Sequence, residues 1–142
     1  MPELPEVETI ARQLDEKLRG KRVADVEVLR ERSFEGNEDL LEGKKIDGVD
    51  RKAKLLIIEF EDWSGVVLVH LKMTGQLVWR PSNWEKGEWK EELAGGHPTD
   101  DWVNELPSSH TRVIWSFEDD SKLFFNDMRV FGWMKIKEKS EW

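Results

Sequence analysis

Apolar residues recur at steps of three and four near the start of the chain and at alternate positions through much of the remainder. The first pattern comprises Val7, Ile10, Ala11, Leu14 and Leu18. This spacing predicts an amphipathic helix over residues 5–19 that ends at Gly20, because side chains three or four positions apart share one face of a helix. The alternating pattern is typical of strands that place one face on a core.

Several later segments have the composition and alternation of strands. They are residues 22–30, 54–60, 65–73, 112–118, 122–127 and 131–138. Two connections are short and polar, EDWSG between the second and third segments and DDS between the fourth and fifth, and they predict hairpins. The sequence therefore predicts a mainly β fold with flanking α structure, a two-layer β-sandwich with the N-terminal helix packed on its flank.

The length and composition of the chain fit one domain. A chain of 142 residues buries roughly 68–70% of its unfolded surface, so we expect a single domain over residues 1–142. The longest apolar runs, residues 55–58 and 66–69, are strand-sized, so we expect a cytoplasmic protein without a membrane span or signal peptide. The absence of cysteine excludes disulfides and thiolate zinc sites, and the three histidines have no metal-ligand spacing.

The formal net charge of −8 has the wrong sign for a surface that follows phosphates. Half of the excess lies in residues 80–107, where three basic residues face seven acidic ones, a net charge of −4. The surrounding segment, residues 78–107, also carries Trp79, Trp84, Trp89 and Trp102. We expect these tryptophans to cluster over one edge of the sandwich. They could instead bind a partner or stack on single-stranded bases, although the negative charge disfavours the second.

The first eight residues, MPELPEVE, place a proline directly after the initiator methionine. Removal of Met1 would leave Pro2 with a free secondary amine, and an α-amino group titrates near ~7.8 against ~10.4 for lysine. Such an amine adds to a sugar aldehyde carbon and forms a cationic iminium, which favours elimination. The alternative interpretation is an ordinary helix start, with Pro5 in the first turn and Glu3, Glu6 and Glu8 favoured by the helix dipole.

The string MPELPEVE at the extreme N-terminus resembles the opening of the formamidopyrimidine-DNA glycosylase family, whose members repair oxidised purines. LKMTG at 71–75 and RVFG at 129–132 extend the resemblance over residues 1–137. The sister family, endonuclease VIII, usually has glycine where this chain has Leu4. The resemblance implies a base-excision DNA glycosylase/AP lyase that removes 8-oxoguanine and FaPy lesions through a proline Schiff base and β,δ-elimination.

Catalytic roles carried over by this resemblance fall on four residues. Pro2 would be the nucleophile, Glu3 the general acid and base, and Glu6 the residue that orients the N-terminus. Lys54 would contact phosphate and lesion near Pro2. A lysine in an alternating strand is otherwise a solvated side chain, which is the structural alternative for Lys54.

DNA-binding roles implied by the resemblance fall on His70, Met73, His110, Arg129 and Phe131. The histidines would contact phosphates, Met73 would fill the void left by the extruded nucleotide, and Phe131 would wedge the neighbouring base step. Arg129 would bind the orphaned base. The structural alternative is core packing for Met73 and Phe131 and a sheet position for His70. One departure is Val130, which occupies the place of a second arginine and is expected to affect loop rigidity.

The resemblance also implies modules that are absent from this chain, a helix-two-turns-helix module and a C-terminal zinc finger. We therefore interpret the chain as the N-terminal domain of a longer protein, with zinc in the finger of that protein and no cofactor or metal in this chain. The expected partner is damaged double-stranded DNA, bound by a monomer together with the missing module and without a membrane. One alternative is an endonuclease VIII-like enzyme for oxidised pyrimidines, against which Leu4 argues. Another is a non-catalytic, acidic, tryptophan-rich interaction module.

Overall fold

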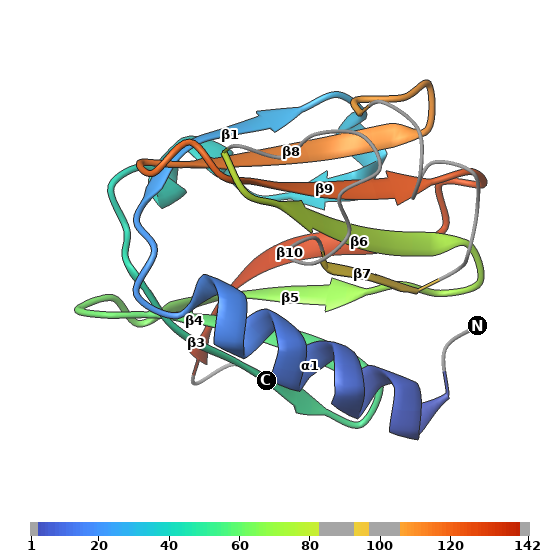
Figure 1. Ribbon diagram of the computed structural model, residues 1–142, viewed down its shortest axis with the longest axis horizontal. Coiled ribbons are helices and arrows are strands. Elements are labelled where there is room, and N and C mark those ends of the chain that lie inside the picture. The colour runs from blue at the N-terminus through green and yellow to red at the C-terminus, as the bar shows by residue number, and fades with distance from the viewer. Residues whose placement is uncertain (1–2, 83–92, 97–105, 140–142) are drawn as a thin grey trace.

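Two five-stranded sheets face each other in the computed structural model, which describes residues 3–82, 93–96 and 106–139 (Figure 1). One sheet has the order β1-β8-β9-β6-β7 and contains β1 (Val23–Val28), β8 (Thr111–Phe117), β9 (Lys122–Asp127), β6 (Gly75–Arg80) and β7 (Leu93–Gly96). The other has the order β2-β10-β5-β4-β3 and contains β2 (Phe34–Glu35), β10 (Trp133–Glu138), β5 (Gly65–His70), β4 (Leu55–Phe60) and β3 (Ile46–Lys52). All neighbouring strands are antiparallel except β2 and β10.

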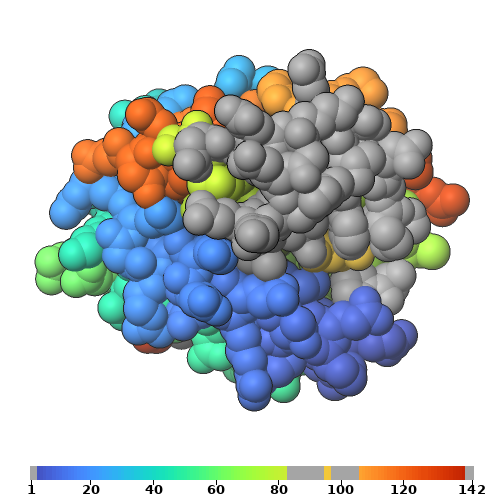
Figure 2. Space-filling view, viewed as in Figure 1, coloured from blue at the N-terminus to red at the C-terminus, as the bar shows by residue number. Residues whose placement is uncertain are grey.

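Helix α1 (Leu4–Leu18) packs against both β3 and β7, the edge strands on one side of the sandwich. Side chains of the helix approach the strand backbone closely at two glycines. A Cβ on Gly48 would lie 2.9 Å from Asp15 Oδ1, and a Cβ on Gly95 would lie 2.7 Å from Ile10 Cγ1. The helix therefore covers the open side of the sandwich and forms the lower part of the face seen in Figure 2. The predicted β-sandwich with a helix on its flank is confirmed.

The core lies between the sheets and under the helix, and it follows the alternation along each strand. On β9, Leu123 and Phe125 face inward with the fully buried Trp115 of β8. The buried helix residues are the five that the periodicity identified: Val7, Ile10, Ala11, Leu14 and Leu18. Short 3-10 helices η1 (Glu31–Ser33) and η2 (Glu38–Leu41) connect β1 to β2 and β2 to β3.

Several strand boundaries differ from the sequence prediction. The predicted strand 65–73 ends at His70, and the predicted strand 131–138 begins at Trp133. Lys54 does not lie in a strand, because β3 and β4 are joined by a turn at residues 53–54. Strand β3 was missed because its sequence, IDGVDRK, is mostly polar, and a strand at a sheet edge needs fewer apolar side chains.

The segment 78–107 is not a continuous loop, since β6 extends to Arg80 and β7 lies within it. Trp79 is a core residue on β6, with Lys17 Nζ and Lys21 Nζ each 5.4 Å from its ring centroid. The predicted tryptophan cluster is therefore wrong for Trp79, and the other three, Trp84, Trp89 and Trp102, lie outside the described residues. In the part of the chain that the structure describes, no helix could span a membrane.

Candidate active site and nucleic-acid interface

The start of helix α1 and the turn between β3 and β4 lie side by side. Glu3 is the N-cap of the helix, and its backbone oxygen accepts a hydrogen bond from the Val7 N–H (3.0 Å). Lys54 occupies the turn, and its Nζ lies 3.8 Å from Glu3 Oε2. Both side chains are accessible to solvent, Glu3 more than Lys54. Two of the residues singled out by the sequence are therefore in contact, although helix and sheet separate them in the chain.

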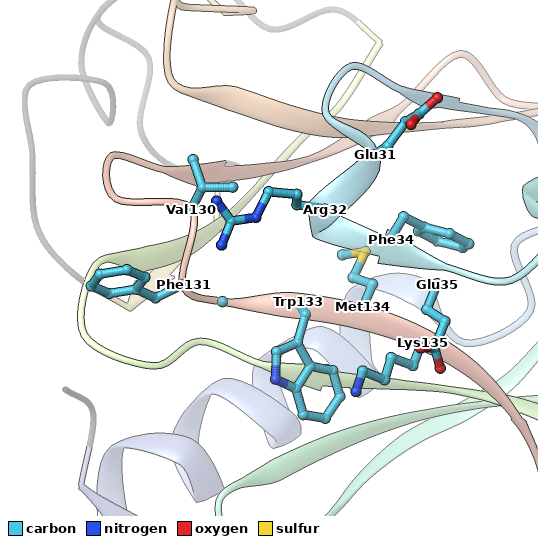
Figure 3. A pocket seen from close by; sticks show the side chains of 10 residues that line it. Glu31, Arg32, Phe34, Glu35, Val130, Phe131, Trp133, Met134 and Lys135 are labelled. Atoms are coloured by element: carbon cyan, nitrogen blue, oxygen red, sulfur yellow. The ribbon is translucent and has the colours of Figure 1, made fainter.

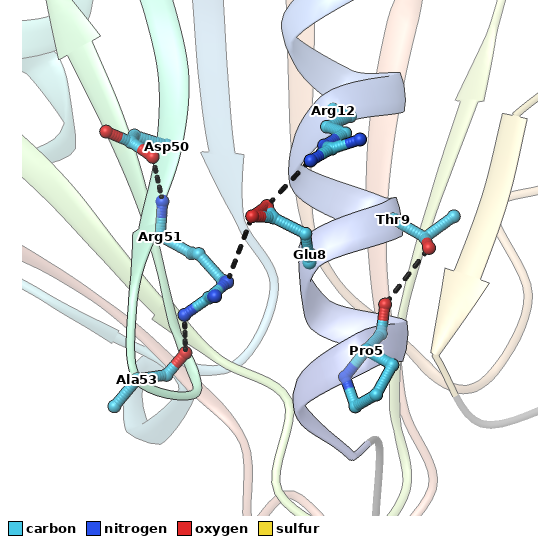
Figure 4. A network of polar contacts seen from close by, with 7 residues as sticks. All are labelled: Pro5, Glu8, Thr9, Arg12, Asp50, Arg51 and Ala53. Carbon is cyan, nitrogen blue, oxygen red and sulfur yellow. Dashed lines mark hydrogen bonds and ion pairs between the residues drawn. The ribbon is translucent and has the colours of Figure 1, made fainter.

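Arg51 holds this turn against the helix (Figure 4). Its Nε lies 3.6 Å from Glu8 Oε1, and its Nη1 donates to the Ala53 carbonyl (3.4 Å). Glu8 also pairs with Arg12 at 3.8 Å. Ala53 has a φ of 52°, the left-handed conformation that short hairpin turns require. Since Lys54 follows Ala53 directly, these contacts set the point from which the lysine side chain extends.

His70 ends β5 and lies opposite Trp133 of β10, with the ring centroids 5.7 Å apart. Its Nδ1 accepts a hydrogen bond from the Lys72 N–H (3.0 Å), which leaves the proton of the neutral ring on Nε2. Burial lowers the pKa of His70, and the charges of Lys72 and Lys54 lower it further. His70 is therefore electrostatically close to Lys54 and carries a donor suited to a phosphate oxygen.

Met73 lies in the turn between β5 and β6, and its side chain is 51% exposed. The preceding residue, Lys72, has a φ of 53° in the left-handed region. The Gly75 N–H donates to the Leu71 carbonyl (2.9 Å), and a Cβ on Gly75 would lie 2.5 Å from that oxygen. The glycine of LKMTG is thus required for a close backbone approach. The exposure contradicts the core interpretation of Met73.

The loop between β9 and β10 presents further exposed side chains. Phe131 is 52% exposed, and Met128 is 46% exposed, so the core interpretation of Phe131 is also wrong. Arg129 is exposed in the same loop. Val130 has a φ of 57°, an unfavourable conformation for a β-branched residue. A Cβ on Gly132 would lie 2.9 Å from the His70 carbonyl oxygen, so this loop passes tightly over the end of β5.

Asp127 is fully buried and links two exposed segments, the turn that carries Met73 and the loop from Arg129 to Phe131. Its Oδ1 accepts hydrogen bonds from the Thr74 hydroxyl and from the Arg129 N–H (3.2 Å). Its Oδ2 accepts from the Gly132 N–H (2.6 Å). Since Thr74 follows Met73 and Gly132 follows Phe131, one carboxylate fastens both segments.

A groove of about 490 Å³ opens beside Phe131 (Figure 3). Residues of η1 and β2 form one wall, and the loop and first residues of β10 form the other. Arg32 extends from η1 across the groove toward Val130. Glu31 and Lys135 also line it, so the groove carries both charges next to the exposed aromatic ring.

Three further residues were predicted from the sequence: Pro2, Glu6 and His110. Pro2 lies outside the described residues, one position before Glu3. Glu6 is exposed in the first turn of α1, and its side chain forms no ion pair or hydrogen bond within the described part of the chain. His110 lies just before β8, and its backbone oxygen accepts from the Asp127 N–H (2.9 Å).

Sequence reasoning missed Asp127, Thr74 and Met128. All three are direct neighbours of motif residues, in LKMTG and in NDMRVFG. Asp127 was read only as the end of a strand. A carboxylate there, beside two glycine-containing turns, was the available signal, because buried acidic side chains need several donors.

Residues 1–134 match the family described as the formamidopyrimidine-DNA glycosylase N-terminal domain. The chain is 33% identical to formamidopyrimidine-DNA glycosylase of Exiguobacterium sibiricum over 98% of its own length and 44% of that protein. It is 36% identical to the protein of the same name from Pelotomaculum thermopropionicum, over 93% of this chain and 42% of that protein. The chain thus spans less than half the length of these relatives.

Solved structures agree with this match. A complex of Lactococcus lactis Fpg with DNA containing an abasic site superposes with a TM-score of 0.76 at 25% identity, over 99% of this chain and 45% of that one. A complex of the same protein with DNA containing N7-benzyl-Fapy-dG gives a TM-score of 0.75 at 27% identity, over 99% and 45%. With the helix-flanked sandwich, the N-terminal string and the match over residues 1–134, the chain belongs to the formamidopyrimidine-DNA glycosylase N-terminal domain family.

Proposed function

We propose that the chain is the N-terminal, catalytic part of a DNA glycosylase/AP lyase that excises oxidised purines. The observation that carries the proposal is the contact between Lys54 Nζ and Glu3 Oε2 at 3.8 Å. Glu3 is the residue directly after Pro2, whose amine is the proposed nucleophile. The names of the relatives and the damaged DNA in the Lactococcus lactis structures support it. The charge of Lys54 also lowers the pKa of His70, and His70 ends the strand that leads into the turn with the exposed Met73.

Pro2 would begin the reaction as the nucleophile. With Met1 removed, the lone pair of its secondary amine attacks C1′ of the damaged nucleotide, and the bond from C1′ to the base breaks. The base leaves with that electron pair and takes up the proton that the proline nitrogen loses. Glu3 donates a proton to the sugar ring oxygen as the ring opens, which leaves an iminium between the proline nitrogen and C1′.

The iminium then drives strand cleavage, because it withdraws electrons from the neighbouring carbon. A base removes a proton from C2′, and the C3′–O bond breaks with the phosphate as leaving group. In a second elimination a proton leaves C4′, and the C5′–O bond breaks with the other phosphate as leaving group. Water then hydrolyses the imine and restores the amine. Glu3, once deprotonated, would accept protons in these steps, and Lys54 Nζ, 3.8 Å from Glu3 Oε2, would hold a phosphate.

Recognition of the lesion would use the exposed side chains of the two turns. The target nucleotide must leave the helix before C1′ can be attacked. Met73 would fill the vacated space, Phe131 would separate the next base step, and Arg129 would donate to the unpaired base. Arg32, in the groove beside Phe131, would bind the phosphate next to the separated step.

The charge of the chain indicates that other segments share the DNA contact. A chain with a net charge of −8 has few basic side chains to spare for neutralising phosphates, so a further basic module is expected in the functional protein. We expect that module to hold a helix-two-turns-helix element and a zinc finger. This chain has no cysteine to bind zinc as a thiolate, and within the part that the structure describes no group of three His, Asp or Glu residues suited to a metal occurs. A cytoplasmic monomer is the expected state.

Trapping with borohydride tests the proposal, since reduction of the imine makes the link between protein and DNA permanent. The chain is incubated with oligonucleotides that carry an abasic site, and the product is digested to locate the modified residue. Attachment at Pro2 is expected. Attachment at Lys54 or another lysine, or no attachment at low salt, contradicts the proposal.

Two alternatives are tested by an excision assay and by the trapping assay. Excision of oxidised pyrimidines in preference to 8-oxoguanine, from otherwise identical duplexes, would favour the endonuclease VIII-like activity. An untagged chain that folds, carries a free Pro2 amine and still forms no covalent product would favour a non-catalytic interaction module.

A further inference from the structure

We propose that Asp127 is a positioning residue whose buried carboxylate fixes the Met73 turn and the Arg129–Phe131 loop relative to each other, so that their side chains enter damaged DNA as one unit. The inference rests on the proposed function. Because Asp127 is fully buried, it cannot contact DNA and acts only through the segments that it holds.

Both oxygens of the carboxylate are used. Oδ1 accepts from the Thr74 hydroxyl and from the Arg129 N–H (3.2 Å), and Oδ2 accepts from the Gly132 N–H (2.6 Å). Hydrogen bonds to an ionised acceptor are shorter and stronger than neutral ones. Thr74 Oγ1 also accepts from the Arg129 N–H (3.3 Å), so the turn and the loop are joined directly as well.

The backbone of Asp127 is anchored independently of its carboxylate. Its N–H donates to the His110 carbonyl (2.9 Å), and its own carbonyl accepts from Arg112 Nε (2.9 Å). Asp127 also lies opposite Gly75 in the pairing of β9 with β6. The carboxylate therefore projects from a fixed strand end, and the two exposed segments are positioned against it.

Both segments need such support. Lys72 in the first has a φ of 53°, and Val130 in the second has a φ of 57°. Residues other than glycine hold this conformation only where the surroundings impose it. Met73 and Phe131 are also half exposed, although apolar side chains on free loops tend to fold back onto the protein. We call the hydrogen bonds of the Asp127 carboxylate to Thr74, Arg129 and Gly132 the clamp. A segment held in its bound conformation loses less entropy on binding, so the clamp would favour insertion into the duplex.

A pair of substitutions at Thr74 tests the role of the clamp. Thr74→Val removes the hydroxyl while keeping the shape of the side chain, and Thr74→Ser keeps the hydroxyl. Rates of borohydride trapping are compared on a duplex abasic site and on the same abasic site in single-stranded DNA, where no stacked duplex must be opened. Thr74→Val is expected to slow trapping on the duplex about tenfold, as for loss of one hydrogen bond to a charged group, and to leave the single-stranded rate unchanged. Thr74→Ser is expected to restore the duplex rate.

Ser121→Ala is the matched control. Ser121 is buried before β9, at the other end of the strand from Asp127, and its hydroxyl donates to Asp119 Oδ1 (2.5 Å). The control loses a hydroxyl-to-carboxylate hydrogen bond away from the two exposed segments, so both trapping rates should stay at the wild-type level. Equal losses on the two substrates for Thr74→Val, no loss at all, or the same loss in Ser121→Ala would overturn the inference.

A failure of the proposed chemistry is recognised separately, because the wild-type chain would then trap neither substrate. The clamp is in that case judged by hydrogen exchange at the Arg129 and Gly132 amides. Exchange at least about tenfold faster in Thr74→Val than in Ser121→Ala supports the clamp, since opening of the loop exposes both amides. Equal exchange in the two variants overturns it.

Discussion

Lys54 Nζ lies 3.8 Å from Glu3 Oε2, which joins a turn at the edge of one sheet to the first residue before helix α1. The contact is between accessible side chains, so its value for stability is small. Its value for the proposed chemistry is different, because Glu3 directly follows Pro2 in the sequence and the contact brings the cation of Lys54 to the Glu3 carboxylate.

Glu3→Gln should slow the proton transfers of the reaction while leaving the Pro2 amine in place. Glutamine keeps the shape of the side chain but cannot transfer protons, and removal of a positioned acid-base group costs on the order of 10²–10⁴-fold in rate. The rates of base release and of strand cleavage on a lesion duplex should fall by that factor while duplex binding is retained. Glu16→Gln, an exposed residue near the other end of the same helix, is the control for a change of charge alone, and an equal loss in both variants would remove the special role of Glu3.

Blocking the N-terminus should abolish activity without unfolding the chain. Retention of Met1, or a tag that is not removed, converts the Pro2 nitrogen into an amide whose lone pair is delocalised and cannot attack C1′. The melting temperature should be unchanged, while base release and trapping are lost. Pro2→Gly, which keeps a primary amine, should be milder. A blocked protein that still forms the reducible complex would place the nucleophile on a lysine.

Shortening the exposed apolar side chains should harm only the reaction that needs an opened duplex. Unstacking the target nucleotide costs a few kcal/mol, and Met73→Ala or Phe131→Ala removes side-chain contacts that offset part of this cost. The excision rate on lesion duplexes should therefore fall roughly tenfold to a hundredfold. Cleavage of a single-stranded abasic site should change little. Because both residues are half exposed, the melting temperature should stay near that of the wild type.

Arg129→Ala should relax the preference for the base opposite the lesion, since its guanidinium is the donor assigned to that base. The measurement is the excision rate of 8-oxoguanine placed opposite each of the four bases. Unchanged ratios would show that Arg129 does not read the unpaired base.

His70 should titrate below its ordinary pKa. Burial and the nearby charges of Lys72 and Lys54 oppose the charged ring. Between the lowered pKa and about 6.5, the unfolded chain binds the proton and the folded chain does not, so the free energy of unfolding should rise with pH across this interval. Lys72→Gln should raise the pKa of His70, as followed by NMR titration of the ring. His70→Asn should flatten the pH dependence, and a His70 that titrates above its ordinary value would contradict the assignment.

Duplex binding by the chain should be weak and sensitive to salt, because its net charge is −8. Arg32→Gln should lower the slope of log affinity against log salt by about 0.9, the amount for one phosphate contact. Arg22→Gln is the matched control, since Arg22 pairs with Glu118 at 3.3 Å beyond the far end of β8. Equal slopes in the two variants would exclude Arg32 from the phosphate contacts.

The sequence by itself determined the helix, most of the strands and the family. The helix could be predicted because the burial of Val7, Ile10 and Leu14 follows a local period, and each strand pair joined by EDWSG or DDS could be predicted because hairpins are local. The string MPELPEVE identified the family through a motif that needs no folding to be read.

Only the tertiary structure decided which of these residues meet and which are exposed. Met73 and Phe131 look like core residues in the sequence, and their exposure depends on where two turns end over the sheets. Asp127 looked like the end of a strand, and its role depends on donors from Thr74, Arg129 and Gly132, the first of which is far away in the chain. The burial and hydrogen bonding of a side chain are set by segments distant in sequence, and periodicity reports only on neighbours.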